Sequence, residues 1–113
     1  MKKIEAIIRP YRFGEVKAAL SDLGMEGMTL TEVKGWGHQK GTEIYRDTEY
    51  QREFLPKLTL EIVVADTEAD SVVEAILNSA RTGGYGDGKV FVSEIEDAIR
   101  VRTEEHGALA VGF

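Results

Sequence analysis

Residues 58–92, LTLEIVVADTEADSVVEAILNSARTGGYGDGKVFV, decide the fold. Leucine and isoleucine alternate with other residues over 58–63, which predicts a strand. The next residues, 66–70, offer side-chain oxygens with the Thr67/Asp70 spacing of a capping box, so a helix is expected to follow. The helix is predicted by a 3.6-residue apolar period formed by Val72, Val73, Ile76, Leu77 and Ala80. After a glycine-rich segment, residues 89–92 predict another strand, so this half of the chain reads β-α-β.

The upstream half has the same order. Residues 3–9 predict a strand that Pro10 ends, and residues 28–34 predict a second strand. Between them, apolar residues recur at helical spacing before Gly24, which is suited to end a helix; they are Phe13, Val16, Leu20 and Leu23. Two β-α-β halves joined by a long segment are typical of the α+β, ferredoxin-like fold, in which two helices cover one face of a four-stranded antiparallel sheet. Residues 95–101 offer a short final strand.

The length and composition predict one domain spanning residues 1–113. Fourteen basic and twenty acidic residues give a net charge of -6, which argues against a nucleic-acid partner. The chain has no cysteine and no apolar run long enough to span a membrane, and its N-terminal apolar patch is too short for a secretory signal, so a cytoplasmic protein is expected. The first three strands look apolar on both sides, so the face without helices is expected to pack against copies of the chain.

A polar segment joins the two halves. Residues 38–56 show no periodicity, and a loop of that length is usually functional or disordered. We therefore expect an exposed effector loop at about residues 37–55.

The glycine-rich segment is the second candidate for function. Gly83, Gly84, Gly86 and Gly88 would let backbone amides approach a phosphate closely, although a plain turn between helix and strand explains them equally well. Lys89 follows directly, and Arg100 and Arg102 are expected on one side of the final strand. The pattern is neither a Walker A motif nor a dinucleotide-binding fingerprint.

These residues resemble a known family. Residues 82–92, TGGYGDGKVFV, followed by Ile95, are similar to the C-terminal signature of the PII nitrogen-regulatory signal proteins. The resemblance extends to residues 1–9, 27–35, 54–57 and 100–103, with Gly37 and residues 39–41. It covers nearly the whole chain except an apolar tail at residues 104–113, for which docking on the assembly or a partner is expected.

The resemblance implies a homotrimer that binds ATP or ADP competitively between neighbouring subunits, and 2-oxoglutarate only together with MgATP. The nucleotide site would comprise Thr29, Gly35, Gly37, His38, Val63, Thr82, Gly86, Asp87, Gly88, Lys89, Arg100 and Arg102, the two arginines coming from the next subunit. The 2-oxoglutarate site would comprise Gln39, Lys40, Gly41, Lys57 and Gly86, with Gln39 completing the shell of the magnesium ion. The loop would regulate target proteins such as an ammonium transporter or a biosynthetic or regulatory enzyme.

The chain departs from the family pattern in the long loop, which looks one residue shorter around residues 41–43, and at three single positions. Tyr50 matches a tyrosine that some members uridylylate, but Asp47 and Thr48 replace the residues usual in that motif. His38 replaces a usual arginine, which would make one charge near the nucleotide dependent on pH.

Two other functions share this topology. A phosphotransferase or nucleotide hydrolase would need an activated nucleophile, and neither His38 nor His106 has an acidic residue spaced along the sequence to orient it. An RNA-recognition module would need aromatic residues on its central strands, and the first and fourth strands offer only Phe91. A regulatory, non-enzymatic sensor is therefore the main prediction.

Overall fold

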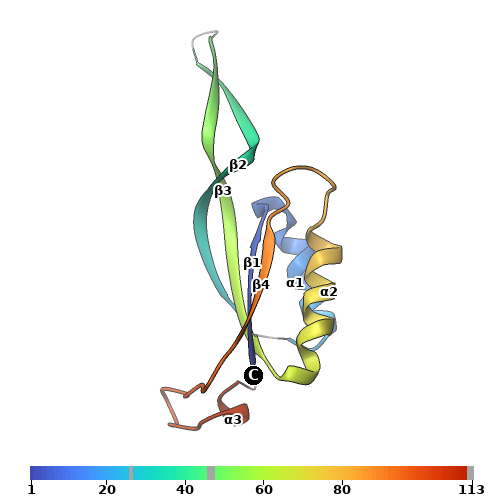
Figure 1. The fold of residues 1–113 in the computed structure, drawn as a ribbon, viewed down its shortest axis with the longest axis vertical. Coiled ribbons are helices and arrows are strands. Elements are labelled where there is room, and N and C mark those ends of the chain that lie inside the picture. Colours follow the sequence, from blue (N-terminus) through green and yellow to red (C-terminus); the bar gives the residue numbers. More distant parts are fainter. Residues whose placement is uncertain (26, 46–47, 112–113) are drawn as a thin grey trace.

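A computed structural model describes residues 1–25, 27–45 and 48–111, with side chains described for residues 1–25, 27–37 and 54–111. Figure 1 shows a sheet with two helices against one side and a long two-stranded ribbon projecting from one end. The elements are β1 Lys2–Ile8, a 3-10 turn Pro10–Arg12, α1 Phe13–Asp22, β2 Thr29–Tyr45, β3 Thr48–Val64, a 3-10 turn Asp66–Glu68, α2 Ala69–Ala80, β4 Lys89–Glu94 and α3 Ala108–Val111.

The sheet has the order β2-β3-β1-β4, and each pair of neighbouring strands is antiparallel. Alternate residues of the central strands β1 and β3 are buried beneath the helices, as the period of two requires: Ile4, Ala6, Ile8, Leu60, Ile62 and Val64. The helices contribute Val16 and Leu20 from α1 and Val72 and Ile76 from α2. The predicted ferredoxin-like fold is confirmed.

The prediction of a patternless segment at residues 38–56 was wrong in its local structure. β2 and β3 pair from Thr29↔Glu61 to Tyr45↔Thr48, with a register shift between Trp36 and Gly41. Backbone hydrogen bonds form this ribbon, and it extends beyond the helices, so no buried face imposes alternation on its sequence. The segment is nevertheless the long projecting element that was expected, in a molecule 57 Å long.

Three smaller expectations also differ. No side chain caps α2; a 3-10 turn precedes it, and Asp66 pairs with the N-terminal amino group at 2.9 Å. Residues 95–101 form no strand, because their only pairing among the described residues is a single bridge between Ile99 and His106. Arg100 and Arg102 therefore lie on a turn instead of one side of a strand.

The sheet face without helices is called the open face. It was predicted to be apolar, but it also carries charged residues. Lys3 and Glu61 form an ion pair across it at 3.3 Å, and Glu5 shares the side of β1 on which Lys3 and Ile7 lie. Among the described residues, no helix is long and apolar enough to cross a membrane.

The layer arrangement predicts opposite outcomes for two leucines that pair across β2 and β3. Leu60 is fully buried and its partner Leu30 is 43% exposed. We expect Leu60→Ala to lower the free energy of unfolding by about 2 to 5 kcal/mol, and Leu30→Ala by less than about 1 kcal/mol. Denaturant unfolding of both variants checks this, and equal losses would contradict the assignment of the buried layer.

Candidate ligand-binding site

A cavity of about 440 Å³ lies on the open face, where the end of β1 meets the base of the ribbon and the glycine-rich loop. Its lining combines small, apolar and cationic residues: Ile7, Gly35, Trp36, Gly37, Leu55, Lys57, Gly86, Gly88, Lys89 and Phe91. Six of these were predicted site residues, namely Gly35, Gly37, Lys57, Gly86, Gly88 and Lys89. The structure therefore brings together segments that are distant in the sequence.

The glycine-rich loop is organised by Asp87. One oxygen of its carboxylate accepts the backbone N–H groups of Thr82 and Gly83, each at 2.8 Å. The other accepts the Thr82 hydroxyl and the Nε of Arg9, the latter at 3.0 Å. Arg9 also donates to the carbonyl of Tyr85 at 2.7 Å. The loop is thus tied to itself and to the end of β1.

These bonds stabilise the ionised form of Asp87. The hydroxyl of Thr82 contributes most to holding the pKa of Asp87 well below its usual range; the two backbone N–H groups and Arg9 act in the same direction, and burial opposes them. Asp87 was predicted among the triphosphate-binding residues. Its carboxylate accepts bonds from the loop's own backbone, from the Thr82 hydroxyl and from Arg9, so its negative charge is engaged within the protein.

Gly88 fixes the loop against β1. Its φ is +99°, and a Cβ built there would lie 1.6 Å from the carbonyl oxygen of Ile7. No side chain can occupy that space, and an L-residue would also be strained at this φ. Lys89 follows directly and pairs in register with Ile7. The close approach therefore sets where β4 begins and the backbone position from which the Lys89 side chain extends.

Lys57 is a nearly buried cation in the cavity wall. It is 8% exposed, its Nζ donates to the carbonyl of Gly86 at 2.6 Å, and its stem lies against Gly35. Burial, and then the charge of Arg9, lower the pKa of Lys57, while Asp87 partly offsets them. A carboxylate entering the cavity would restore an opposite charge to a group that has already lost most of its water.

The other predicted site residues whose side chains the structure describes do not line this cavity. Val63 pairs with Lys3, four residues along β1 from Ile7, or about 13 Å at the usual rise per residue. Thr29 lies opposite Glu61 near the same end, and Thr82 serves the loop as described above. The side chains of His38, Gln39, Lys40, Gly41 and Tyr50 lie outside those that the structure describes.

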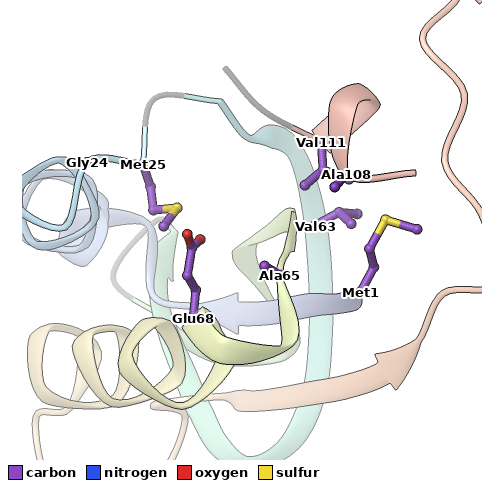
Figure 2. A pocket seen from close by; sticks show the side chains of 8 residues that line it. All are labelled: Met1, Gly24, Met25, Val63, Ala65, Glu68, Ala108 and Val111. Carbon is purple, nitrogen blue, oxygen red and sulfur yellow. The ribbon is translucent and has the colours of Figure 1, made fainter. Parts of the chain in front are cut away.

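A second cavity, of about 210 Å³, lies at that end of the sheet. Figure 2 shows the residues that line it, which come from both termini, from β3 and from the segments next to the helices: Met1, Gly24, Met25, Val63, Ala65, Glu68, Ala108 and Val111. Arg100 donates from Nη2 to the carbonyl of Leu109 in α3 at 3.0 Å, which links the turn carrying Arg100 and Arg102 to this region. Thr29 and Val63 lie toward this end of the sheet, and Arg100 and Arg102 lie on the turn beyond it. These four residues, called the second group, are away from the glycine loop of the same chain.

The comparisons with known proteins agree with this geometry. The chain matches the family described as "Nitrogen regulatory protein P-II" over residues 1–105. The chain belongs to the P-II family. Curated P-II proteins of Rhizobium meliloti and Pasteurella multocida are 56% and 54% identical to it over 112 residues, covering 98% of this chain and 100% of each relative. The crystal structure of Arabidopsis thaliana PII bound to citrate superposes with a TM-score of 0.81, at 39% identity over 99% of this chain and 90% of that one.

For this P-II protein, reasoning from sequence missed the contribution of Arg9. The residue stood only as the end of a strand before Pro10, and nothing in its neighbourhood shows that it reaches across to residues 85 and 87. The apolar side chains of Ile7, Leu55 and Phe91 also entered no site prediction. Ile7 and Phe91 lay within predicted strands and Leu55 in the predicted loop, and no pattern in the sequence connected the three.

The close approach at Gly88 gives a sharp test of the loop geometry. We expect Gly88→Ala to cost at least about 3 kcal/mol of stability, because the methyl group meets a backbone atom and the φ is unfavourable. Gly14→Ala is the matched control: nothing lies within 4 Å of its Cβ position, so stability should be unchanged or slightly raised. Thermal unfolding of both variants checks this, and a tolerated Gly88→Ala would show that the loop does not lie against β1.

Proposed function

We propose that this P-II protein is a sensor of nitrogen, carbon and energy status that binds ATP or ADP in competition and, together with MgATP, 2-oxoglutarate. The observation that carries the proposal is the cavity where Lys57, Lys89 and four glycines meet at the base of the projecting ribbon. The protein would act in the cytoplasm by regulating other proteins, and the matched relatives are themselves named as regulatory.

The glycine loop and Lys89 suit a polyphosphate. Gly86 and Gly88 both have a φ of 99°, which leaves their amides unobstructed by side chains, and Lys89 supplies a charge for charge-assisted hydrogen bonds. Such a local cluster can bind a compact anion although the whole chain carries a charge of -6. Bound nucleotide would supply the triphosphate oxygens on which magnesium is held.

The two groups of site residues favour a site shared between subunits. The first group consists of the predicted residues that line the cavity at the Ile7 end of the sheet. The second group lies at the Val63 end, so a single chain cannot enclose a nucleotide with both groups. A head-to-tail contact between open faces would bring the first group of one protomer to the second group of the next, and three such contacts can close a ring. The positions of these residues support the proposed homotrimer.

The 2-oxoglutarate site would adjoin the first group. Lys57 offers a desolvated ammonium group for a carboxylate, beside the backbone of Gly86. Among the described residues there is no cluster of three or more acidic or histidine side chains that could hold a metal ion, so magnesium would rely on oxygens of its ligands and on Gln39. The solved plant PII bound to citrate shows that a relative accepts a small polycarboxylate.

The ribbon would carry the signal. Gly35, Trp36 and Gly37 line the cavity and belong to β2, where the register shift begins after Trp36, so a ligand would touch the root of the ribbon directly. Ligands that bind the root differently would favour different ribbon conformations, and the coupling between nucleotide and 2-oxoglutarate would be reciprocal. An ammonium transporter or a biosynthetic or regulatory enzyme would be the target, and Tyr50 remains a candidate for modification.

Calorimetric titration of three variants tests the ligand assignments. Lys89→Ala and Arg102→Ala should each weaken ATP and ADP binding roughly ten- to a hundred-fold, because each removes a charge-assisted bond. Lys57→Ala should lose 2-oxoglutarate binding in the presence of MgATP and largely keep nucleotide binding. Lys17→Ala, an exposed cation on α1, is the control, and phosphate release assayed alongside tests the alternative of a nucleotide hydrolase. Unchanged affinities in all three variants would place the site elsewhere.

Mixing two defective proteins tests whether the site is shared. Lys89→Ala keeps an intact second group, and Arg102→Ala keeps an intact first group. Co-refolded trimers that contain both variants should therefore regain one nucleotide site each with the wild-type affinity, whereas either variant alone regains none. If all the residues act within one subunit, mixing will restore nothing.

A further inference from the structure

Residues 97–107 form a closed turn held at its base by one carboxylate. Asp97 Oδ1 accepts the backbone N–H groups of Ala98 at 2.9 Å and Gly107 at 3.2 Å, and Oδ2 lies 2.7 Å from Nδ1 of His106. Gly107 also donates to the carbonyl of Ala98 at 2.9 Å. Asp97 thus joins both legs of the turn.

Spacing along the sequence did not indicate an acidic partner for His106, and the fold brings Asp97 to it. An ionised carboxylate only accepts hydrogen bonds, so Nδ1 of His106 must donate. The bond from His106 contributes most to holding the pKa of Asp97 below its usual range, and the two backbone N–H groups act in the same direction. Nine residues separate the partners, and only the path of the turn brings them together.

The tip of the turn carries the cations that the nucleotide site needs. Arg100 donates its N–H to the carbonyl of Glu105 at 2.9 Å and accepts the N–H of Glu104 at 2.8 Å, which closes the tip around Arg102. Glu104 has a φ of 60°, a conformation that is unfavourable for a residue other than glycine. Strain of this kind persists where surrounding bonds hold the backbone in place, and the Asp97 bonds are suited to do so.

We infer that Asp97 and His106 form a positioning clamp that sets Arg100 and Arg102 for the phosphates of a nucleotide bound to the neighbouring protomer. The inference rests on the proposed nucleotide function. Neither clamp residue would touch the nucleotide. A carboxylate–imidazole pair also orients the histidine in some enzymes, but His106 is more than half exposed and lines neither of the cavities described above.

Titration with ATP and ADP, each with magnesium, tests the clamp on the full-length protein. His106→Ala should weaken binding about two- to five-fold, as for loss of an exposed charged pair. Asp97→Ala should weaken it further, because it removes two additional bonds to backbone. His106→Asn should restore the wild-type affinity, since its amide can donate from nearly the position of Nδ1. Glu96→Gln, which removes an adjacent exposed charge, is the control and should bind normally.

A second measurement separates positioning from general stability. In a background with both Arg100 and Arg102 changed to alanine, His106→Ala should cause no further loss of affinity, because the clamp acts only through those side chains. Thermal unfolding should show a melting temperature for His106→Ala close to that of the wild type, because the exposed pair contributes little to global stability. A large drop would assign the loss of affinity to general stability and overturn the clamp.

The measurements distinguish a failure of the proposed nucleotide function from a failure of the clamp. If the wild-type protein binds neither nucleotide, the proposed function and the clamp are both overturned. If it binds both, and Arg102→Ala loses them while His106→Ala and Asp97→Ala bind like the wild type, only the clamp is overturned. Equal losses for His106→Ala and His106→Asn would also overturn it.

Discussion

The contact between Gly88 and the carbonyl of Ile7 constrains the rest of the site. At this point the glycine loop lies so close to the end of β1 that a side chain would overlap a backbone atom. The contact fixes the start of β4, and with it the position of Lys89 beside the base of the ribbon. The bonds that Asp87 accepts then tie the rest of the loop to itself and to the end of β1. The shape of the cavity therefore depends on backbone packing before any charge is considered.

Charge is distributed around this loop so that the cavity is cationic on an acidic protein. Arg9 and Asp87 neutralise each other behind the loop, at 3.0 Å, and leave Lys57 and Lys89 on the cavity side. The charged form of Lys57 is disfavoured by this arrangement, because burial and the nearby Arg9 both lower the pKa of Lys57. A site that holds a partly desolvated cation in the absence of ligand gains more from an incoming anion than an exposed lysine would, because the desolvation has already taken place on folding.

The sequence predicted the parts of the structure that a buried face determines. Strands β1, β3 and β4 and helices α1 and α2 each pack a face against the core. Periodicity located α1, α2 and the inner part of β3, and short apolar runs indicated β1 and β4. The ribbon formed by the outer parts of β2 and β3 was not predicted, because its pairing is made by backbone groups away from the helices. For the site, family resemblance named Lys57 and Lys89, but the pairs Arg9–Asp87 and Asp97–His106 depend on how distant segments meet. No spacing rule in a single sequence encodes such meetings.

The distance between the cavity and the second group of residues explains why a site at a subunit boundary would suit a sensor. The cavity and the second group of residues lie at opposite ends of the sheet, and the ribbon starts at one of those ends only. A ligand that bridges two protomers would therefore contact the ribbon root of one and the C-terminal turn of the other. Tighter binding of that ligand would act on the root of the ribbon through Gly35, Trp36 and Gly37. The strand pairing shifts register after Trp36, beyond the part of the sheet that the helices cover. A change in the direction of the ribbon beyond this point would leave the buried layer between β1, β3 and the helices in place. Under the proposed function, the conformational change would then be confined to the element that would meet the target.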